Sequence, residues 1–275
     1  MIGQMQLRPQ RAPGLLPAVG GLWVIVSAGL FVLFLTVPLL VLLGRAVGGS
    51  LASIRQPLVV HALMLTVLTT CVTVLLSLLF GTPLAYVLAR RAFPGRRLLE
   101  TALTLPLVLP PLVAGVALLV AFGRRGLLGR PLDEAGLAVP FTTAAVVLAQ
   151  LFVAGPFFIR AARIGFGAVS REMAEAAAVA GAGGWETFRR VILPLSLPGV
   201  VSGVVLCAAR AFSEFGATLM FAGNIEGRTQ TMALAIETAI QTDLNSALAL
   251  SLVLVVIAAV ALAVPLLLVR GTELV

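Results

Sequence analysis

Lysine is absent from this chain of 275 residues, and all 19 of its basic residues are arginine. A phosphate-binding loop of the Walker A type needs a lysine to hold the β- and γ-phosphates of a nucleotide, so these residues contain no such loop. There are two cysteines, Cys71 and Cys207, both inside apolar runs, and one histidine, His61. Because these residues cannot form a cysteine and histidine cluster, no metal site is expected.

Charged residues are also scarce. They make up 11% of the chain, against about 25% in an ordinary soluble domain. Hydrophobic residues make up 60%, and the mean hydropathy is +1.11. A fold this apolar needs lipid to solvate its outer surface. The net charge of +8 does not indicate a nucleic-acid partner, because the arginines lie between long apolar runs rather than on one solvated face.

Long apolar runs predict an all-α, polytopic membrane protein. A spanning helix needs about 20 mostly apolar residues, and six segments meet this requirement. The first is too long for the core of a cleaved signal peptide, so we expect it to be retained. The six segments cover about residues 22–43, 62–88, 101–122, 142–159, 197–220 and 246–269.

Arginines between the segments predict the orientation, because cytoplasmic loops are enriched in basic residues. One side holds six arginines, and the other holds twice as many. This bias predicts that both termini and the loop of about residues 160–196 lie in the cytoplasm. The cytoplasmic arginines are Arg8, Arg11, Arg90, Arg91, Arg96, Arg97, Arg160, Arg163, Arg171, Arg189, Arg190 and Arg270.

The third apolar segment contains three prolines within residues 105–111, including Pro110 and Pro111. Each proline removes a helix hydrogen bond and clashes with the preceding turn. Irregular backbone at membrane depth must face protein or water. The segment is therefore predicted to be a bent helix, which either lines a pathway or serves packing alone.

The loop between the fourth and fifth segments has a pattern of its own. Alanine-rich residues 172–180 favour a helix, and the glycines of residues 181–184 break it. A second short helix is predicted over residues 185–191, ending before Pro194. Trp185 and Phe188 would be its apolar anchors. Such a two-helix bracket suits docking into a groove of a partner protein.

The same loop resembles the conserved cytoplasmic loop of ABC importer permeases. That pattern is Glu-Ala-Ala, three residues, glycine, nine residues, isoleucine, one residue, and Leu-Pro. Val191 replaces the usual isoleucine. In this family the loop couples the membrane subunit to an ATPase, and the resemblance implies this role for Trp185 as well. The matching positions are Glu175, Ala176, Ala177, Gly181, Leu193 and Pro194.

Two further stretches resemble the molybdate permeases within that family. One is residues 105–111, and the other is residues 214–232, where Glu226 and Ala233 depart from the usual prolines. Sulfate permeases share part of the second stretch, and tungstate permeases look similar enough that the anion stays open. The resemblance implies a MetI-like type I permease fold, a homodimer, an ABC ATPase dimer that binds ATP and magnesium, and a periplasmic molybdate-binding protein.

It also implies a division of the chain. Residues 1–60 would form a cytoplasmic tail, the first span and the first periplasmic loop. Residues 61–270 would form the permease domain, with a coupling loop at about residues 171–194. Residues 271–275 would be a short cytoplasmic tail. The protein is expected to lie in the inner membrane, to bind no cofactor itself, and to have no enzymatic site.

The fifth segment holds two charges, Arg210 and Glu214, four residues apart and so on one face of a helix. A charge in the membrane costs roughly 2.5–3.5 kcal/mol, which a partner reduces. The two side chains form either an internal ion pair, or part of a translocation path or gate together with Gly216, or both. After this segment, the polar outer loop with Asn224, Arg228 and Thr229 is either a contact for the binding protein, part of an outer gate, or a plain turn.

Two other classes of protein compete with this interpretation. A proton-driven transporter would use Glu214 as its carrier, but it leaves the cytoplasmic bracket unexplained. An intramembrane metalloprotease would need two histidines in a His-Glu-x-x-His motif, and the chain has one.

Overall fold

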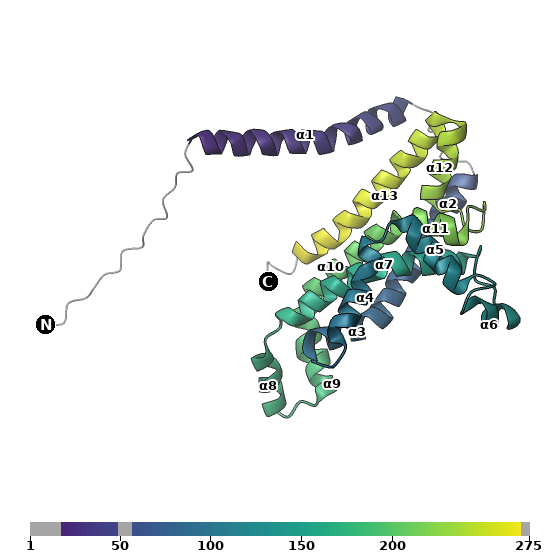
Figure 1. Ribbon diagram of the computed structural model, residues 1–275. Helices are drawn as coiled ribbons and strands as arrows, with labels where there is room; N and C mark the ends of the chain where they lie inside the picture. The colour runs from purple at the N-terminus through teal and green to yellow at the C-terminus, as the bar shows by residue number, and fades with distance from the viewer. Residues whose placement is uncertain (1–17, 49–56, 271–275) are drawn as a thin grey trace. The chain divides into compact units, whose positions relative to one another are not determined.

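The computed structural model describes residues 18–48 and 57–270, and all regular structure in these ranges is helical. The all-α prediction is therefore confirmed. The chain divides into two compact units, Met1–Gly48 and Gly49–Val275. The first unit contains α1 (Ala18–Gly48), and the second contains every other helix (Figure 1). The tails predicted at residues 1–17 and 271–275 lie outside the described residues.

Four helical runs are long and apolar enough to cross a membrane, namely Leu22–Arg45, Leu58–Arg90, Thr143–Ala168 and Gly184–Phe212. A bent pair, α4 (Arg96–Val108) and α5 (Pro111–Phe122), makes a fifth if it is one span. The predicted sixth span corresponds to α13 (Leu244–Arg270), a helix of 27 residues.

The second and fifth spans each contain a short π-helical stretch. The second consists of α2 (Pro57–Leu76), η2 (Ser77–Gly81) and α3 (Thr82–Arg90). The fifth begins with α9 (Gly184–Thr187), η3 (Phe188–Ile192) and α10 (Leu193–Phe212). The fourth is the single helix α7 (Thr143–Ala168).

The third span is more sharply broken than predicted. The helix axis turns by 119° between α4 and α5. Leu109 and Pro110 both have ψ 135. Each of these residues precedes a proline, which disfavours the helical conformation. Pro111 then starts α5, where its missing N–H costs nothing.

The prediction that the second loop helix ends before Pro194 was wrong. The helical run continues from Gly184 to Phe212. In η3 the Leu193 N–H donates to the Phe188 carbonyl, five residues back. This wider turn changes the bonding register just before the proline, and Pro194 falls in the first turn of α10.

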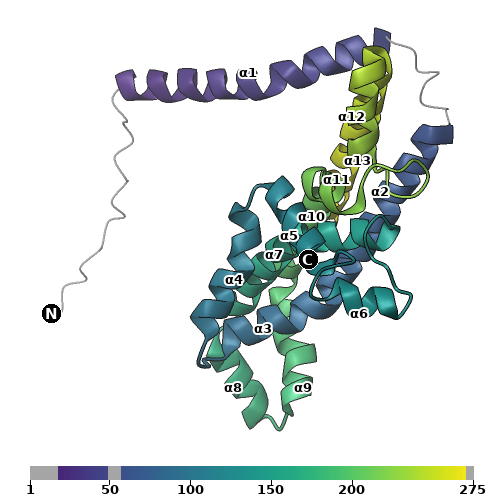
Figure 2. The ribbon, with the colours of Figure 1, turned by 45° about the vertical axis from the view of Figure 1, so that its right-hand side comes forward.

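The central contact of the second unit is between α7 and α10, which lie side by side in both views (Figures 1 and 2). Glycines bring the two backbones close together. A Cβ added to Gly199 would lie 2.5 Å from the Gly165 Cα, and one on Gly203 would lie 3.0 Å from the Phe158 carbonyl oxygen. Small residues commonly allow such approach between membrane helices. The buried side chains of Phe158, Phe166 and their neighbours fill the rest of this interface.

A second close contact joins α5 to α11 (Gly216–Ala222). A Cβ on Gly115 would lie 2.7 Å from the Met220 Cβ and 2.8 Å from the Ala217 carbonyl oxygen. On the other side of the second unit, α12 (Met232–Thr242) and α13 pack against the start of α2. The remaining short helices are α6 (Gly129–Glu134) and α8 (Arg171–Val179).

Replacing Gly115 with valine is expected to lower the free energy of unfolding by about 1–3 kcal/mol, because the added atoms overlap α11. Thermal unfolding of the purified chain in detergent measures this. Gly167→Val is the matched control, since no atom lies within 4 Å of its added Cβ. Equal unfolding temperatures for the two variants would contradict the packing argument.

Candidate functional site

Arg210 and Glu214 form an ion pair, but they do not share a helix. The fifth span was predicted as one helix over about residues 197–220. Instead, α10 ends at Phe212, and α11 begins at Gly216. Glu214 lies in the break, and its Oε2 is 2.6 Å from Nη2 of Arg210. The other carboxylate oxygen, Oε1, accepts a hydrogen bond of 2.8 Å from the Ala217 N–H, in the first turn of α11.

The surroundings of the two charges differ. The Glu214 side chain is fully buried, whereas that of Arg210 is 24% exposed. The carboxylate is therefore held by a cation and by a backbone N–H. The guanidinium reaches the surface of the described chain.

Gln150, which sequence reasoning missed, connects this break to two other spans. Its Nε2 donates to the Ala211 carbonyl at the end of α10, at 3.2 Å. Its Oε1 accepts from the Thr73 hydroxyl of α2, at 3.1 Å. Gln150 is 1% exposed, in the middle of α7. The sequence could have indicated this residue, because an isolated glutamine in an apolar span needs hydrogen-bond partners when its amide is buried.

The break in the third span meets the break in the fifth. A Cβ on Gly216 would lie 3.0 Å from the Pro111 Cβ, so the first turns of α5 and α11 are in contact. Pro110 and Pro111 themselves are exposed on the described chain. Four of the five predicted pathway residues thus gather at two neighbouring helix breaks, and Arg210 lies one turn away from Glu214.

The predicted bracket consists of α8, a turn and α9, which project beyond the ends of the neighbouring long helices (Figure 2). Ser170 caps α8 by accepting the Met173 N–H, and Gly181 has φ +89, a conformation that suits glycine. Glu175 and Ala176 are exposed, whereas Ala177 is half-buried.

Apolar side chains are exposed on the bracket. Val179 is 89% and Trp185 72% exposed, and Met173 is exposed as well. Exposed apolar groups gathered at one end of a protein mark an interaction surface. Leu193 is half-buried and Pro194 exposed where the bracket joins α10.

Four aromatic rings connect the bracket to the spans. Trp185 stacks on Phe188 with ring centroids 5.6 Å apart. Phe188 meets Tyr86 of α3 edge to face at 5.0 Å, and Tyr86 meets Phe166 of α7 at 5.6 Å. Such pairs add about 0.5–1.5 kcal/mol each beyond their buried area. A continuous series of side-chain contacts therefore joins α9 to α3 and α7.

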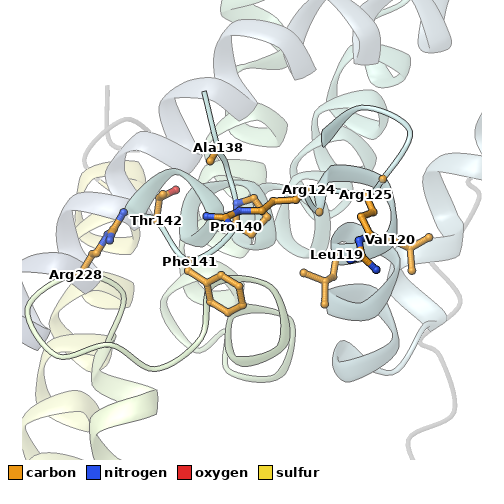
Figure 3. A pocket seen from close by; sticks show the side chains of 11 residues that line it. Leu119, Val120, Arg124, Arg125, Ala138, Pro140, Phe141, Thr142 and Arg228 are labelled. Carbon is orange, nitrogen blue, oxygen red and sulfur yellow. The ribbon is translucent and has the colours of Figure 1, made fainter. Parts of the chain in front are cut away.

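The loop after α11 is an organised structure. The Thr229 hydroxyl accepts from the Ile225 N–H at 2.9 Å and donates to the Gly223 carbonyl at 3.2 Å. Asn224 Nδ2 donates to the Thr238 hydroxyl. Thr229 is fully buried, so it holds the loop together. The Arg228 side chain points into a cavity of about 830 Å³ that also receives Arg124 and Arg125 (Figure 3).

Within residues 18–48 and 57–270, no three His, Cys, Asp or Glu side chains are grouped so that they could hold a metal ion. The two cysteines differ in position, with Cys71 exposed and Cys207 buried.

The structure combines two broken helices that meet with an exposed bracket that contacts the spans through aromatic side chains. These are features of a membrane subunit of a transporter. Residues 81–272 match the family described as binding-protein-dependent transport system inner membrane component, and the chain belongs to this family of ABC importer permeases. It is a transport subunit of the inner membrane and not an enzyme, and ATP hydrolysis belongs to a separate subunit.

Curated relatives fall into three groups of permease. The chain is 44% identical to the molybdenum transport system permease protein ModB of Mycobacterium tuberculosis, over 82% of this chain and 86% of that one. It is 35% identical to the sulfate transport system permease protein CysW of Escherichia coli K12, over 84% and 81%. It is 34% identical to the molybdate/tungstate transport system permease protein WtpB of Thermococcus kodakarensis, over 62% of this chain and 64% of that one.

Among solved structures, a bacterial alginate ABC transporter in complex with a periplasmic protein has a chain of the same fold. The TM-score is 0.71 at 16% identity, over 90% of this chain and 92% of that one. The predicted type I permease fold is confirmed by this likeness and by the family match.

We expect Arg210→Met to destabilise the chain more than Glu214→Gln does. The methionine leaves a fully buried carboxylate unpaired, whereas the partly exposed arginine can reach water. Losing one partner of a buried pair costs about 3–5 kcal/mol, and the double variant should recover much of that loss. Unfolding temperatures of the three variants in detergent test this. Strictly additive effects would show that the two charges do not interact.

Proposed function

We propose that this chain is the channel-forming subunit of an ATP-driven importer that carries molybdate across the inner membrane. A periplasmic protein would deliver the anion, and a separate ATPase dimer would supply the energy. The observation that carries the choice of molybdate is the 44% identity to the mycobacterial molybdenum permease, against 35% to the sulfate permease, over alignments of similar length. Tungstate and sulfate are the alternative substrates.

The bracket α8–α9 would dock on the ATPase. Two observations in the segment that resembles the family's coupling loop support this docking. The side chains of Glu175, Ala176 and Trp185 are exposed, and the chain turns at Gly181. Closure of the ATPase would push on α9. The stacked rings of Trp185, Phe188, Tyr86 and Phe166 would then pass that movement to α3 and α7. Leu193 and Pro194 would connect the same movement to α10.

The two helix breaks would line the anion's path and form its gate. Gly216 and Pro111 bring the breaks together, and Pro110 ends the extended segment before α5. Arg210 would offer a positive charge at the edge of the path. Glu214 would partly neutralise this charge, so that a dianion would not bind tightly. A weak site suits transport, because the ion must leave as well as enter.

Glu214 is a poor candidate for a proton carrier. Its carboxylate is paired with Arg210 and accepts the Ala217 N–H. A proton carrier at this position would have to break both contacts at every turnover.

The assembly would contain two copies of this chain, an ATPase dimer and the binding protein, surrounded by lipid. Both termini and the bracket would face the cytoplasm, as the arginine bias predicts. Residues 61–270 would form the permease domain. The preceding segment, residues 1–60, would add one span, and residues 271–275 would be a cytoplasmic tail.

Uptake by proteoliposomes tests the function. The chain is reconstituted with its ATPase and binding protein, and radiolabelled molybdate is measured inside the vesicles with ATP present. Unlabelled tungstate and sulfate are added as competitors to rank the anions. Uptake driven by a pH gradient without the ATPase would overturn the ATP-driven mechanism, and preferential competition by sulfate would overturn the substrate.

Glu175→Arg is expected to abolish ATP-driven uptake and to weaken co-purification of the ATPase by more than tenfold. Glu175 is exposed, so its charge reversal should leave the unfolding temperature of the permease unchanged. Glu134→Arg is the matched control, because this carboxylate lies on α6, beyond the opposite end of α7 from the bracket. Normal ATP-driven uptake in the Glu175 variant would show that the bracket does not couple the ATPase to transport.

A further inference from the structure

A cavity of about 830 Å³ opens at the end of α7 that is opposite to the bracket. The 26 residues of α7 separate the two ends by about 39 Å, so the cavity belongs to the outer side if the bracket is cytoplasmic. Three arginines and several apolar side chains line it (Figure 3). The lining side chains used below are Leu119, Val120, Arg124, Arg125, Phe141 and Arg228.

Backbone contacts fix the segments that carry these arginines. The Leu128 N–H donates to the Ala121 carbonyl at 2.9 Å, which folds the turn after α5 back on that helix. A Cβ on Gly129 would lie 1.8 Å from the Gly123 carbonyl oxygen, so the turn around Arg124 and Arg125 is tightly closed. On the other wall, the Thr143 hydroxyl donates to the Arg228 carbonyl at 2.9 Å. The cavity is therefore built by two loops that are each fixed to a helix.

Phe141 forms part of the wall in an unfavourable conformation. Its φ is 62, a left-handed value that side chains other than glycine rarely adopt. The ring is half-exposed, and it lies so close to Gly223 that a Cβ there would be 3.0 Å from it. Backbone strain of this kind costs roughly 1–3 kcal/mol and gathers at functional positions. Here it presents an aromatic ring to the cavity.

The charge of the cavity is positive. Arg124 lies 3.9 Å from the Asp133 carboxylate, both groups being partly exposed. For Arg125 and Arg228, no carboxylate of the described residues lies within salt-bridge distance. Exposed arginines beside an aromatic ring and aliphatic groups are the usual composition of a protein-binding hot spot.

The size of the cavity indicates its occupant. Its volume equals that of roughly 28 water molecules at about 30 Å³ each. A five-atom oxyanion would touch only one part of such a wall, and the aliphatic side chains Leu119 and Val120 offer it nothing. A loop with an apolar tip flanked by carboxylates would fill the cavity and pair with the free arginines.

We propose that this cavity is the socket for an acidic, apolar-tipped loop of the substrate-binding protein, held by Arg125, Arg228 and Phe141. The proposal rests on the proposed function, which requires a binding protein on this side. It gives a role to the hydrogen bond that joins the Arg228 carbonyl to Thr143 of α7. Docking at the cavity would act on α7 and on α5, which begins directly after the break at Pro110.

The test uses the complete assembly in nanodiscs, with its ATPase and purified binding protein. ATPase stimulation is measured against binding-protein concentration for the wild type, Arg125→Glu, Arg228→Glu and Phe141→Ala. Charge reversal is expected to raise the half-stimulating concentration by roughly tenfold or more in each arginine variant and to flatten its dependence on salt. Phe141→Ala should raise it without changing the salt dependence.

Arg130→Gln is the control, because Arg130 is exposed on the same side, outside the cavity, and pairs with Glu134. It should stay within twofold of the wild type. Unshifted curves for both arginine variants would overturn the proposal, given that they still co-purify with the ATPase as a single species. A second result would also overturn the proposal. If calorimetry showed that the wild type binds molybdate without the binding protein, and that both arginine variants lose this binding, the cavity would be an anion site. Absence of stimulation in the wild type would instead contradict the proposed function.

Discussion

Lipid cannot hydrogen-bond a backbone, and this constraint governs the arrangement of the second unit. Each break in a spanning helix leaves N–H and C=O groups that protein must satisfy. The breaks at Pro110 and at Ser213–Phe215 lie against each other through Gly216 and Pro111. The Glu214 carboxylate accepts the Ala217 N–H in the first turn of α11, and Gln150 donates to the last turn of α10. The polar side chains of this region thus stabilise the irregular backbone that the proposed path requires.

The two ends of the second unit show a common design. At one end, aromatic contacts join an exposed bracket to α3 and α7. At the other, the Thr143 hydroxyl joins the loop after α11 to the start of α7. Since α7 also packs along α10 and carries Gln150, one helix contacts both ends of the unit and the break at the end of α10. A single helix in contact with both surfaces gives a physical basis for the proposed coupling between ATPase closure and the delivery of substrate.

Hydropathy predicted four of the six spans and the bent third one, because lipid exposure selects long apolar runs, a local property of the chain. Of the sixth, the described residues show a shorter apolar helix, Leu244–Val260. The helix of α8 and its glycine turn were also predictable, since propensity and capping act within a few residues. Predictions failed where a residue's effect depended on its neighbours. Pro194 was taken to end a helix, but η3 accommodates it. Arg210 and Glu214 were placed on one helix, but α10 ends between them.

The sequence by itself determined the membrane class, the helical fold and the bracket, because these depend on composition and on short patterns. It also indicated the segments that contain Glu175 to Gly181 and Arg210 to Glu214. Only the tertiary structure decided that two breaks meet, that Gln150 connects three spans, and that Arg124, Arg125 and Arg228 share one cavity with a strained Phe141. These groups come from positions far apart in the chain, and their proximity arises from helix packing that no local pattern encodes.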